Sequence, residues 1–176
     1  MKSSFALIPA HRDRSPAIDL TGFIERENNR LEISYGLSGT AQIIVPVMAS
    51  KPIRQFDLWE HTCFEFFLGI KSTAKYWEFN LSPAGHWNVF RFLKYRHEIA
   101  EEMAFQNLPM KVSRSDNELQ LNLEINLDSI IAPEQSLDIG ITAVIEDRQK
   151  NLSYWALTHP KPEADFHNRD SFIINL

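Results

Sequence analysis

Two glutamates and an asparagine stand out as residues whose types and spacing suit ligand chemistry. Glu65 alternates with apolar residues in one stretch, and Glu78 and Asn80 alternate with aromatic residues in the next. Successive side chains of a β-strand point to opposite faces of the sheet. If these stretches are neighbouring strands whose apolar residues face the core, the two carboxylates and the amide lie together on the other face.

A third stretch, Trp87–Leu93, adds an indole and a guanidinium to that surface. Trp87 and Arg91 share one set of alternate positions, and we assign this set to the polar face. Aromatic rings cover the apolar C–H faces of a sugar, while carboxylate, amide and guanidinium groups hydrogen-bond its hydroxyls. An exposed sheet on which Arg91 pairs with a glutamate explains the pattern equally well, since such a cross-strand pair contributes ~0.2–1 kcal/mol without any ligand.

Paired carboxylates also suggest glycoside hydrolysis, in which an acid and a base or nucleophile stand roughly 5–9.5 Å apart. Glu65 and Glu78 would meet this requirement on adjacent strands, as many structural pairs do. The sequence contains no GxSxG, HExxH, P-loop or dinucleotide fingerprint. We therefore expect no catalytic residues, and keep a hydrolase using Glu65 and Glu78 as an alternative.

A second polar cluster lies near the C-terminus. His159, Asp165 and His167 carry imidazole and carboxylate groups that suit a divalent metal, and Arg169 follows them. Their spacing matches no strict metal pattern, and prolines next to His159 favour a fixed irregular path. We expect a structural loop that holds Trp155 against the sheet, and no bound metal.

His61 raises the possibility of haem. A noncovalent six-coordinate haem can use one histidine and one methionine, and the candidate methionines are Met48, Met103 and Met110. CxxCH is absent, which excludes covalent haem of the c type. We expect no cofactor, with a noncovalent haem-binding domain as a further alternative.

The composition is that of a folded globular protein. The chain has 176 residues, 44% hydrophobic and 23% charged, which predicts a single domain over residues 1–176. The net charge is −5 without a concentrated basic stretch, so nucleic acid and anionic membranes are not expected as partners. The only cysteine, Cys63, lies in an apolar run, which predicts an inert packed thiol.

The N-terminal region shows no secretory segment. The apolar stretch Phe5–Ala10 is broken by Pro9 and followed by charged residues, whereas a secretory signal needs roughly 7–15 apolar residues. We expect a cytoplasmic protein whose partner is a small-molecule or carbohydrate ligand. The sequence leaves the oligomeric state open.

Alternation with a period of two dominates the chain, so β-strands must position the residues named above. The clearest case is Glu118–Leu127, with apolar residues at every second position. Asn28-Asn29 and Asp116-Asn117 are typical of hairpin turns, 96–106 shows a weak helical pattern, and Asp128–Ala132 allows at most one helical turn. The other expected strands are Phe5–Ala10, Leu20–Arg26, Arg30–Leu37, Ala41–Val47, Thr62–Ile70, Lys75–Ser82, Trp87–Leu93, Lys111–Arg114, Ile139–Glu146, Leu152–Leu157 and Ser171–Leu176. This pattern predicts an all-β fold, an antiparallel β-sandwich.

Three blocks of sequence carry a family resemblance. They are LWEHTCFEFFLG, YWEFNLSPAGHWNVFRF and SYWALTHPKPEADFHNRDSF, and the chain from about Leu58 to Leu176 resembles DOMON-like β-sandwiches related to the family 9 carbohydrate-binding modules. The resemblance implies roughly nine to eleven strands and a sugar or haem ligand held against one sheet or under its edge loops. It also implies aromatic rings that stack on a sugar, for which Trp59, Trp87 and Trp155 are the candidates.

Overall fold

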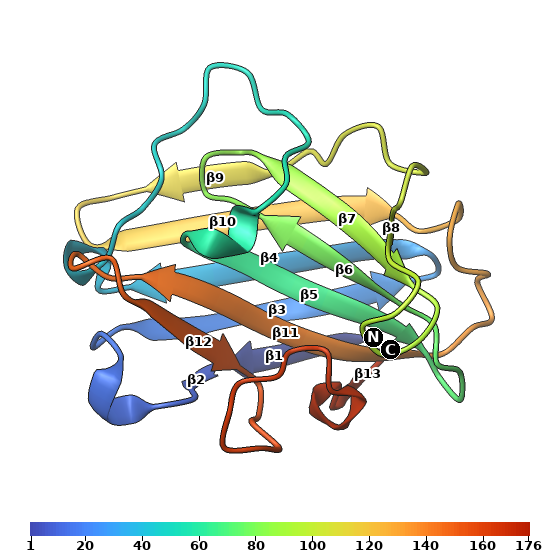
Figure 1. Ribbon diagram of the computed structural model, residues 1–176. Helices are drawn as coiled ribbons and strands as arrows, with labels where there is room; N and C mark the ends of the chain where they lie inside the picture. The colour runs from blue at the N-terminus through green and yellow to red at the C-terminus, as the bar shows by residue number, and fades with distance from the viewer.

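The computed structural model describes residues 1–176 and shows two antiparallel sheets packed face to face (Figure 1). The first sheet has five strands, in the order β1 (Lys2–Ala6), β3 (Asp19–Glu27), β4 (Arg30–Ser38), β10 (Glu118–Asn126) and β9 (Lys111–Arg114). The second, which we call the site sheet, has the order β2 (Ile8–Pro9), β12 (Leu152–Ala156), β11 (Leu137–Glu146), β5 (Cys63–Ile70), β6 (Tyr76–Leu81), β7 (Trp87–Phe92) and β8 (Ala100–Glu101), with β13 (Ile174–Asn175) paired to β11. The predicted all-β sandwich is confirmed.

Helical structure is limited to four short 3₁₀ turns. They are η1 (Arg12–Arg14), η2 (Thr40–Gln42), η3 (Leu58–Glu60) and η4 (Arg169–Ser171). None of the helices is both long and apolar enough to cross a membrane.

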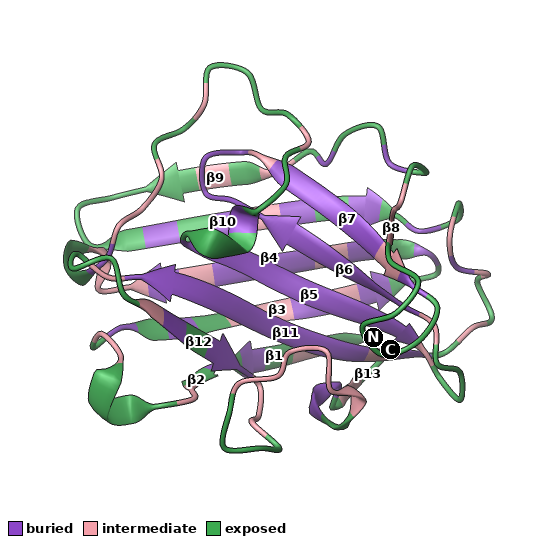
Figure 2. Cartoon of the chain, viewed as in Figure 1, coloured by how far each residue is buried: buried purple, intermediate pink, exposed green.

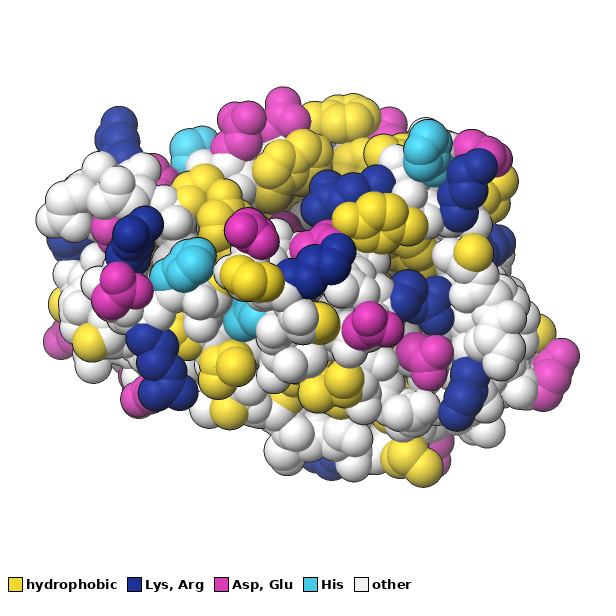
Figure 3. All heavy atoms as spheres, turned by 60° about the horizontal axis from the view of Figure 1, so that its bottom comes forward, with side chains coloured by type: hydrophobic (Ala, Val, Ile, Leu, Met, Phe, Trp, Pro, Cys, Tyr) yellow, Lys and Arg dark blue, Asp and Glu magenta, His cyan; other side chains and the backbone are white.

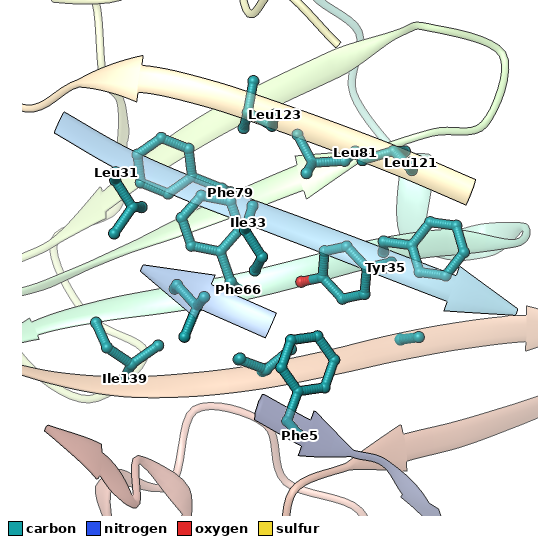
Figure 4. Packing of buried hydrophobic residues seen from close by; sticks show 14 of the residues in the cluster. Phe5, Leu31, Ile33, Tyr35, Phe66, Phe79, Leu81, Leu121, Leu123 and Ile139 are labelled. Atoms are coloured by element: carbon teal, nitrogen blue, oxygen red, sulfur yellow. The ribbon is translucent and has the colours of Figure 1, made fainter. Parts of the chain in front are cut away.

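The core lies between the two sheets and is built by the alternation visible in the sequence. On β10, residues at odd positions from Leu119 to Ile125 are buried, and those between them are exposed or partly exposed. The rings of Phe66 and Phe79 stack at 4.4 Å between centroids, and the Tyr35 hydroxyl donates a hydrogen bond across the core to the Glu65 carbonyl oxygen at 2.7 Å. Figure 4 shows these side chains converging from both sheets.

The site sheet is buried on both faces at its centre (Figure 2). All six residues of β6 are buried, as are all of β5 except its last residue. One face of these strands packs on the core. The other must therefore be covered by loops, which is where a sheltered site can form.

Three expected strands differ from the structure. Ala41–Val47 is not a strand: it starts with η2, and only Ile43 forms a bridge, to Asp147. The Gln42 side chain there bonds both the amide and the carbonyl of Ala17, and Pro46 has no N–H to give to a ladder. The stretch Phe5–Ala10 divides between β1 and β2 in different sheets, and of Ser171–Leu176 only β13 is extended in a sheet.

The expected weak helix over 96–106 is also absent. Arg96 and Glu98 adopt positive φ values of 51° and 55°, which a right-handed helix does not allow. The segment instead contributes Arg96 and Ile99 to the outer face of the site sheet, forms β8 and then sends Phe105 into the core. This path brings Arg96 to the site described next.

Candidate ligand-binding pocket

A pocket of about 670 Å³ lies on the outer face of the site sheet. Strands β5, β6, β7, β11 and β12 contribute its floor, and η3, the β7–β8 loop and the C-terminal loop contribute its walls. The volume is within the range typical of small-molecule sites. Its aromatic lining residues are Trp59, Phe67, Phe90, Phe92, Tyr154 and Phe166, and its charged or titratable ones are Glu60, Glu65, Glu78, Arg96 and His167. Figure 3 shows hydrophobic, acidic and basic side chains intermixed around hollows in the molecular surface.

The strand register explains why the predicted polar residues meet here. Glu65 lies opposite Asn80 on the neighbouring strand, and Glu78 is two residues from Asn80. Residues paired across two strands share a face, so the three side chains lie on one surface. Their predicted common face is confirmed by this register, and the two glutamates line the pocket.

Glu65 is the more deeply buried carboxylate, with 2% of its surface exposed. Its Oε2 accepts a hydrogen bond of 3.1 Å from the Thr142 hydroxyl on the adjacent strand β11. Burial raises the pKa of Glu65 well above its ordinary value, and repulsion from Glu78 raises it further. The carboxyl group therefore favours its protonated form.

Glu78 is 7% exposed and receives one hydrogen bond, at 3.0 Å from the Asn80 amide to its Oε1. Its Oε2 lies 3.8 Å from His167 Nε2. Burial raises the pKa of Glu78 to about 7, although the Asn80 bond and the charge of Arg96 oppose the rise. Near neutral pH, this carboxyl group changes its charge with small changes in its surroundings.

His167 packs among aromatic rings at the edge of the pocket. Its ring centroid lies 5.3 Å from that of Phe67 and 5.0 Å from that of Phe92, and its Nδ1 is 2.9 Å from the Tyr76 hydroxyl. Burial is the main cause that lowers the pKa of His167 to about 4, and the charge of Arg96 adds to the effect. The imidazole is therefore neutral at pH 7.

Arg96 is the basic residue of the pocket lining. Its guanidinium donates to Asp165 at 3.2 Å, and Asp165 also accepts from the Tyr95 hydroxyl at 2.8 Å and from Lys161 at 3.3 Å. Tyr95 and Arg96 come from the β7–β8 loop, whereas Lys161 and Asp165 come from the C-terminal loop. Asp165 thus ties together two loops that cover the pocket.

Trp59 forms the exposed part of the aromatic lining. It lies in η3, is 37% exposed, and packs edge to face on Phe90 with centroids 5.9 Å apart. Tyr154 contacts Phe166 of the C-terminal loop at 5.9 Å. A ring that is held in place and still partly open to solvent has a face free to stack on a ligand.

Three residues expected at the ligand lie on the core side of the sheet. Trp87 and Arg91 pair directly with Leu81 and Trp77, which face the core, and Trp155 belongs to the same core cluster. The assignment of Trp87 and Arg91 to the polar face was wrong because each set of alternate positions on β7 holds two apolar residues and one polar residue, so its hydrophobic pattern does not mark the inner face. Phe90 and Phe92 take the outer face, and on β12 Tyr154 lines the pocket in place of its neighbour Trp155.

The C-terminal loop is bonded to the sandwich at several points. His159 Nε2 lies 2.9 Å from the Ile8 carbonyl oxygen, and Arg169 donates to Asp138 at 3.2 Å and to three backbone carbonyls. His159 and Arg169 do not line the pocket, whereas His167 does. The expected contact with Trp155 is made by Tyr154, through Phe166.

The residues considered for haem or thiol chemistry do not line this pocket. His61 Nδ1 is 2.9 Å from Glu146 Oε2, and neither His61 nor any methionine lines the pocket. The His/Met pair considered as an alternative is therefore not assembled there. Cys63 is fully buried, and burial raises the pKa of its thiol, as expected for a packed, unreactive cysteine.

Five lining residues were not predicted from the sequence: Phe90, Phe92, Arg96, Tyr154 and Phe166. Tyr76 pairs with Phe92, and Glu78 pairs with Phe90. Since Tyr76 and Glu78 were expected on the outer face, knowledge of the β6–β7 register would have placed Phe90 and Phe92 there as well. Arg96 and Phe166 come from loops and carry no periodic signal.

Solved structures share this fold. A crystal structure of a candidate carbohydrate-binding protein from Bacteroides uniformis ATCC 8492 superimposes with a TM-score of 0.75 and 11% identity, covering 98% of this chain and 84% of that one. A family 9 carbohydrate-binding module from Caldicellulosiruptor kristjanssonii, solved in complex with glucose, gives a TM-score of 0.54 and 10% identity over 92% of this chain and 76% of that one. No protein-family model and no curated protein matches the sequence significantly. At such low identities, the likeness shows the β-sandwich fold.

Proposed function

We propose that this protein is a noncatalytic binding protein for a small carbohydrate or sugar-like molecule, which occupies the pocket on the site sheet. The proposal rests on the lining of one pocket of about 670 Å³. This pocket is lined both by the buried carboxylates Glu65 and Glu78 and by aromatic rings, of which Trp59 is partly exposed. The sequence resemblance to DOMON-like proteins related to family 9 modules, and the fold shared with carbohydrate-binding proteins, support it.

The chemistry of the lining suits a sugar. The rings of Trp59 and Phe90 offer apolar surfaces to the C–H faces of a pyranose, and Glu65 and Glu78 offer oxygen atoms to its hydroxyls. Each carboxyl group keeps oxygen atoms that no protein donor occupies. A protonated carboxyl also donates a hydrogen bond, which a hydroxyl oxygen accepts.

Titration calorimetry with a panel of mono- and oligosaccharides tests the proposal. We expect at least one sugar to bind, and Trp59→Ala to weaken the binding of that sugar by about tenfold or more, because a nucleobase stacked on one aromatic ring contributes roughly 1–3 kcal/mol and a sugar face covers a similar area. Ile53→Ala is the control, since Ile53 is an exposed apolar residue on the same segment and does not line the pocket. Binding that survives Trp59→Ala unchanged would place the ligand elsewhere.

Aryl glycosides separate binding from hydrolysis. The pKa of Glu78, raised to about 7, is the feature that favours the hydrolytic alternative, because a general acid works best near the ambient pH. A hydrolase, however, also needs an ionised partner, and burial raises the pKa of Glu65 well above its ordinary value, which opposes ionisation of this carboxyl group in the free pocket. We expect no release of the aryl group, and release that disappears in Glu65→Gln would contradict a noncatalytic role.

A further inference from the structure

The acidic part of the pocket has no matching positive charge. Glu65 and Glu78 lie on adjacent strands and are almost fully buried. The hydrogen bonds that they receive come from neutral groups, the Thr142 hydroxyl and the Asn80 amide. No lysine or arginine of the chain forms a salt bridge with either carboxylate.

The nearest basic groups do not supply this charge. His167 is 3.8 Å from Glu78 but is neutral at pH 7. Arg96 lines the pocket and its charge favours the ionised form of Glu78, but its guanidinium is already paired with Asp165 at 3.2 Å and its side chain is half exposed, so it balances the two acids only in part. Glu60 adds another carboxylate to the lining. The pocket therefore keeps an excess of acidic groups that a ligand can balance.

Aromatic rings surround the same carboxylates. Phe67 on β5 and Phe90 on β7 each pair directly with Glu78 across the strands, and Trp59 packs against Phe90. The face of an aromatic ring attracts cations, more strongly where water is excluded. Rings and buried carboxylates together favour an ammonium group over a neutral hydroxyl.

We propose that the ligand carries a protonated amine, which lies beside Glu65 and Glu78 among these rings. Combined with the proposed sugar-binding function, on which this inference rests, the ligand class is an amino sugar. The ammonium donates hydrogen bonds to the carboxylate oxygens that the protein leaves free, and its charge offsets the repulsion between the two acids.

Ligand binding is then coupled to a proton. The Glu78 pKa of about 7 means that the free pocket holds a substantial fraction of this carboxyl protonated near neutral pH. An ammonium favours the ionised form, so binding releases protons to the buffer. Affinity falls as the pH drops below about 7, because Glu78 must then give up its proton to bind the cation.

Two matched pairs of probes test the inference by calorimetry: glucosamine against glucose, and cyclohexylamine against cyclohexanol. Each pair differs by an amine in place of a hydroxyl. We expect the amine of each pair to bind at least about tenfold more tightly, since a hydrogen bond between charged groups is worth more than a neutral one. The glucosamine titration is then repeated near neutral pH in buffers that differ in their protonation enthalpy. The measured binding enthalpy should change from buffer to buffer in the direction that indicates proton release.

Isosteric variants assign the effect to the carboxylates. Glu78→Gln keeps the shape of the side chain and an oxygen for Asn80, so we expect it to fold and to lose most of the preference for the amine and most of the proton release. Glu65→Gln provides a second, independent variant. Glu134→Gln, an exposed glutamate outside the pocket, should keep the preference, and circular dichroism checks the fold of each variant.

The outcomes separate the two proposals. Equal affinity for glucosamine and glucose, or a preference that persists in both pocket variants, overturns the amine inference and leaves sugar binding intact. Binding of cyclohexylamine without binding of any sugar keeps the amine site and overturns the carbohydrate function. Failure of all four probes at millimolar concentration overturns the amine inference as well.

Discussion

Glu78 gives the site sheet a stability that depends on pH. In the unfolded chain this carboxyl group ionises near its ordinary pKa of 4.5, whereas burial raises the pKa to about 7 in the fold. The folded state therefore holds its proton more tightly. The resulting stabilisation is present below about pH 4.5 and is lost as the pH rises through about 7.

Replacing Glu78 with glutamine should remove this dependence. We expect Glu78→Gln and the natural protein to be similarly stable at about pH 4, and the variant to be the more stable by up to about 3 kcal/mol at about pH 8, because each pKa unit corresponds to about 1.4 kcal/mol. Urea unfolding at a series of pH values measures the difference. A difference between the two proteins that does not vary with pH would show that Glu78 does not titrate in this way.

The C-terminal loop shows how one carboxylate can organise two segments. Asp165 accepts from Tyr95, Arg96 and Lys161, and burial alone would raise its pKa, yet these bonds lower it. The ionised form is therefore the one that the folded loops favour. The pocket depends on this tie because both loops contribute lining residues.

Asp165→Asn should loosen the cover of the pocket without unfolding the sandwich. The amide keeps the shape but loses the charge and one acceptor, so we expect faster proteolysis in 93–99 and 160–168 and a small change in melting temperature. Limited proteolysis followed by mass spectrometry locates the cuts. Glu163 lies in the same loop and is exposed, so Glu163→Gln should change neither the cleavage nor the melting temperature. Equal cleavage of the two variants would argue against a tie through Asp165.

Across the whole molecule, the two sheets share one core. A single cluster of 32 buried residues contains side chains from both sheets, including the stacked pair Phe66 and Phe79. We therefore propose that residues 1–176 unfold as one domain. Tryptophan fluorescence and circular dichroism should then report one coincident transition.

The same core sets the expected cost of a cavity. Phe66 has no exposed surface, so Phe66→Ala should lower the free energy of unfolding by roughly 3–5 kcal/mol. Phe56→Ala removes a ring that is 53% exposed and should cost less than about 1 kcal/mol. Denaturant melts compare the two, and similar losses would mean that the region around Phe66 does not form the core.

Local alternation was enough to predict much of the fold and part of the site. Side chains two residues apart on a strand share a face. This rule predicts the buried positions of β10 and the common face of Glu65, Glu78 and Asn80, and the structure confirms both. Alternation also marks strands whether or not their partners are known. For this reason the all-β sandwich and the outer polar face were readable from the sequence.

Tertiary structure decided the rest of the site. Each set of alternate positions on β7 holds two apolar residues and one polar residue, so only pairing with β6 shows that Phe90 faces the pocket and Arg91 the core side. Arg96 and His167 reach the pocket from loops 71 residues apart in the sequence, positioned by Asp165 and by the Tyr76 hydroxyl. Periodicity assigns a residue to a face within its own strand, whereas a pocket depends on which strands and loops meet, and that is fixed by packing across the whole chain.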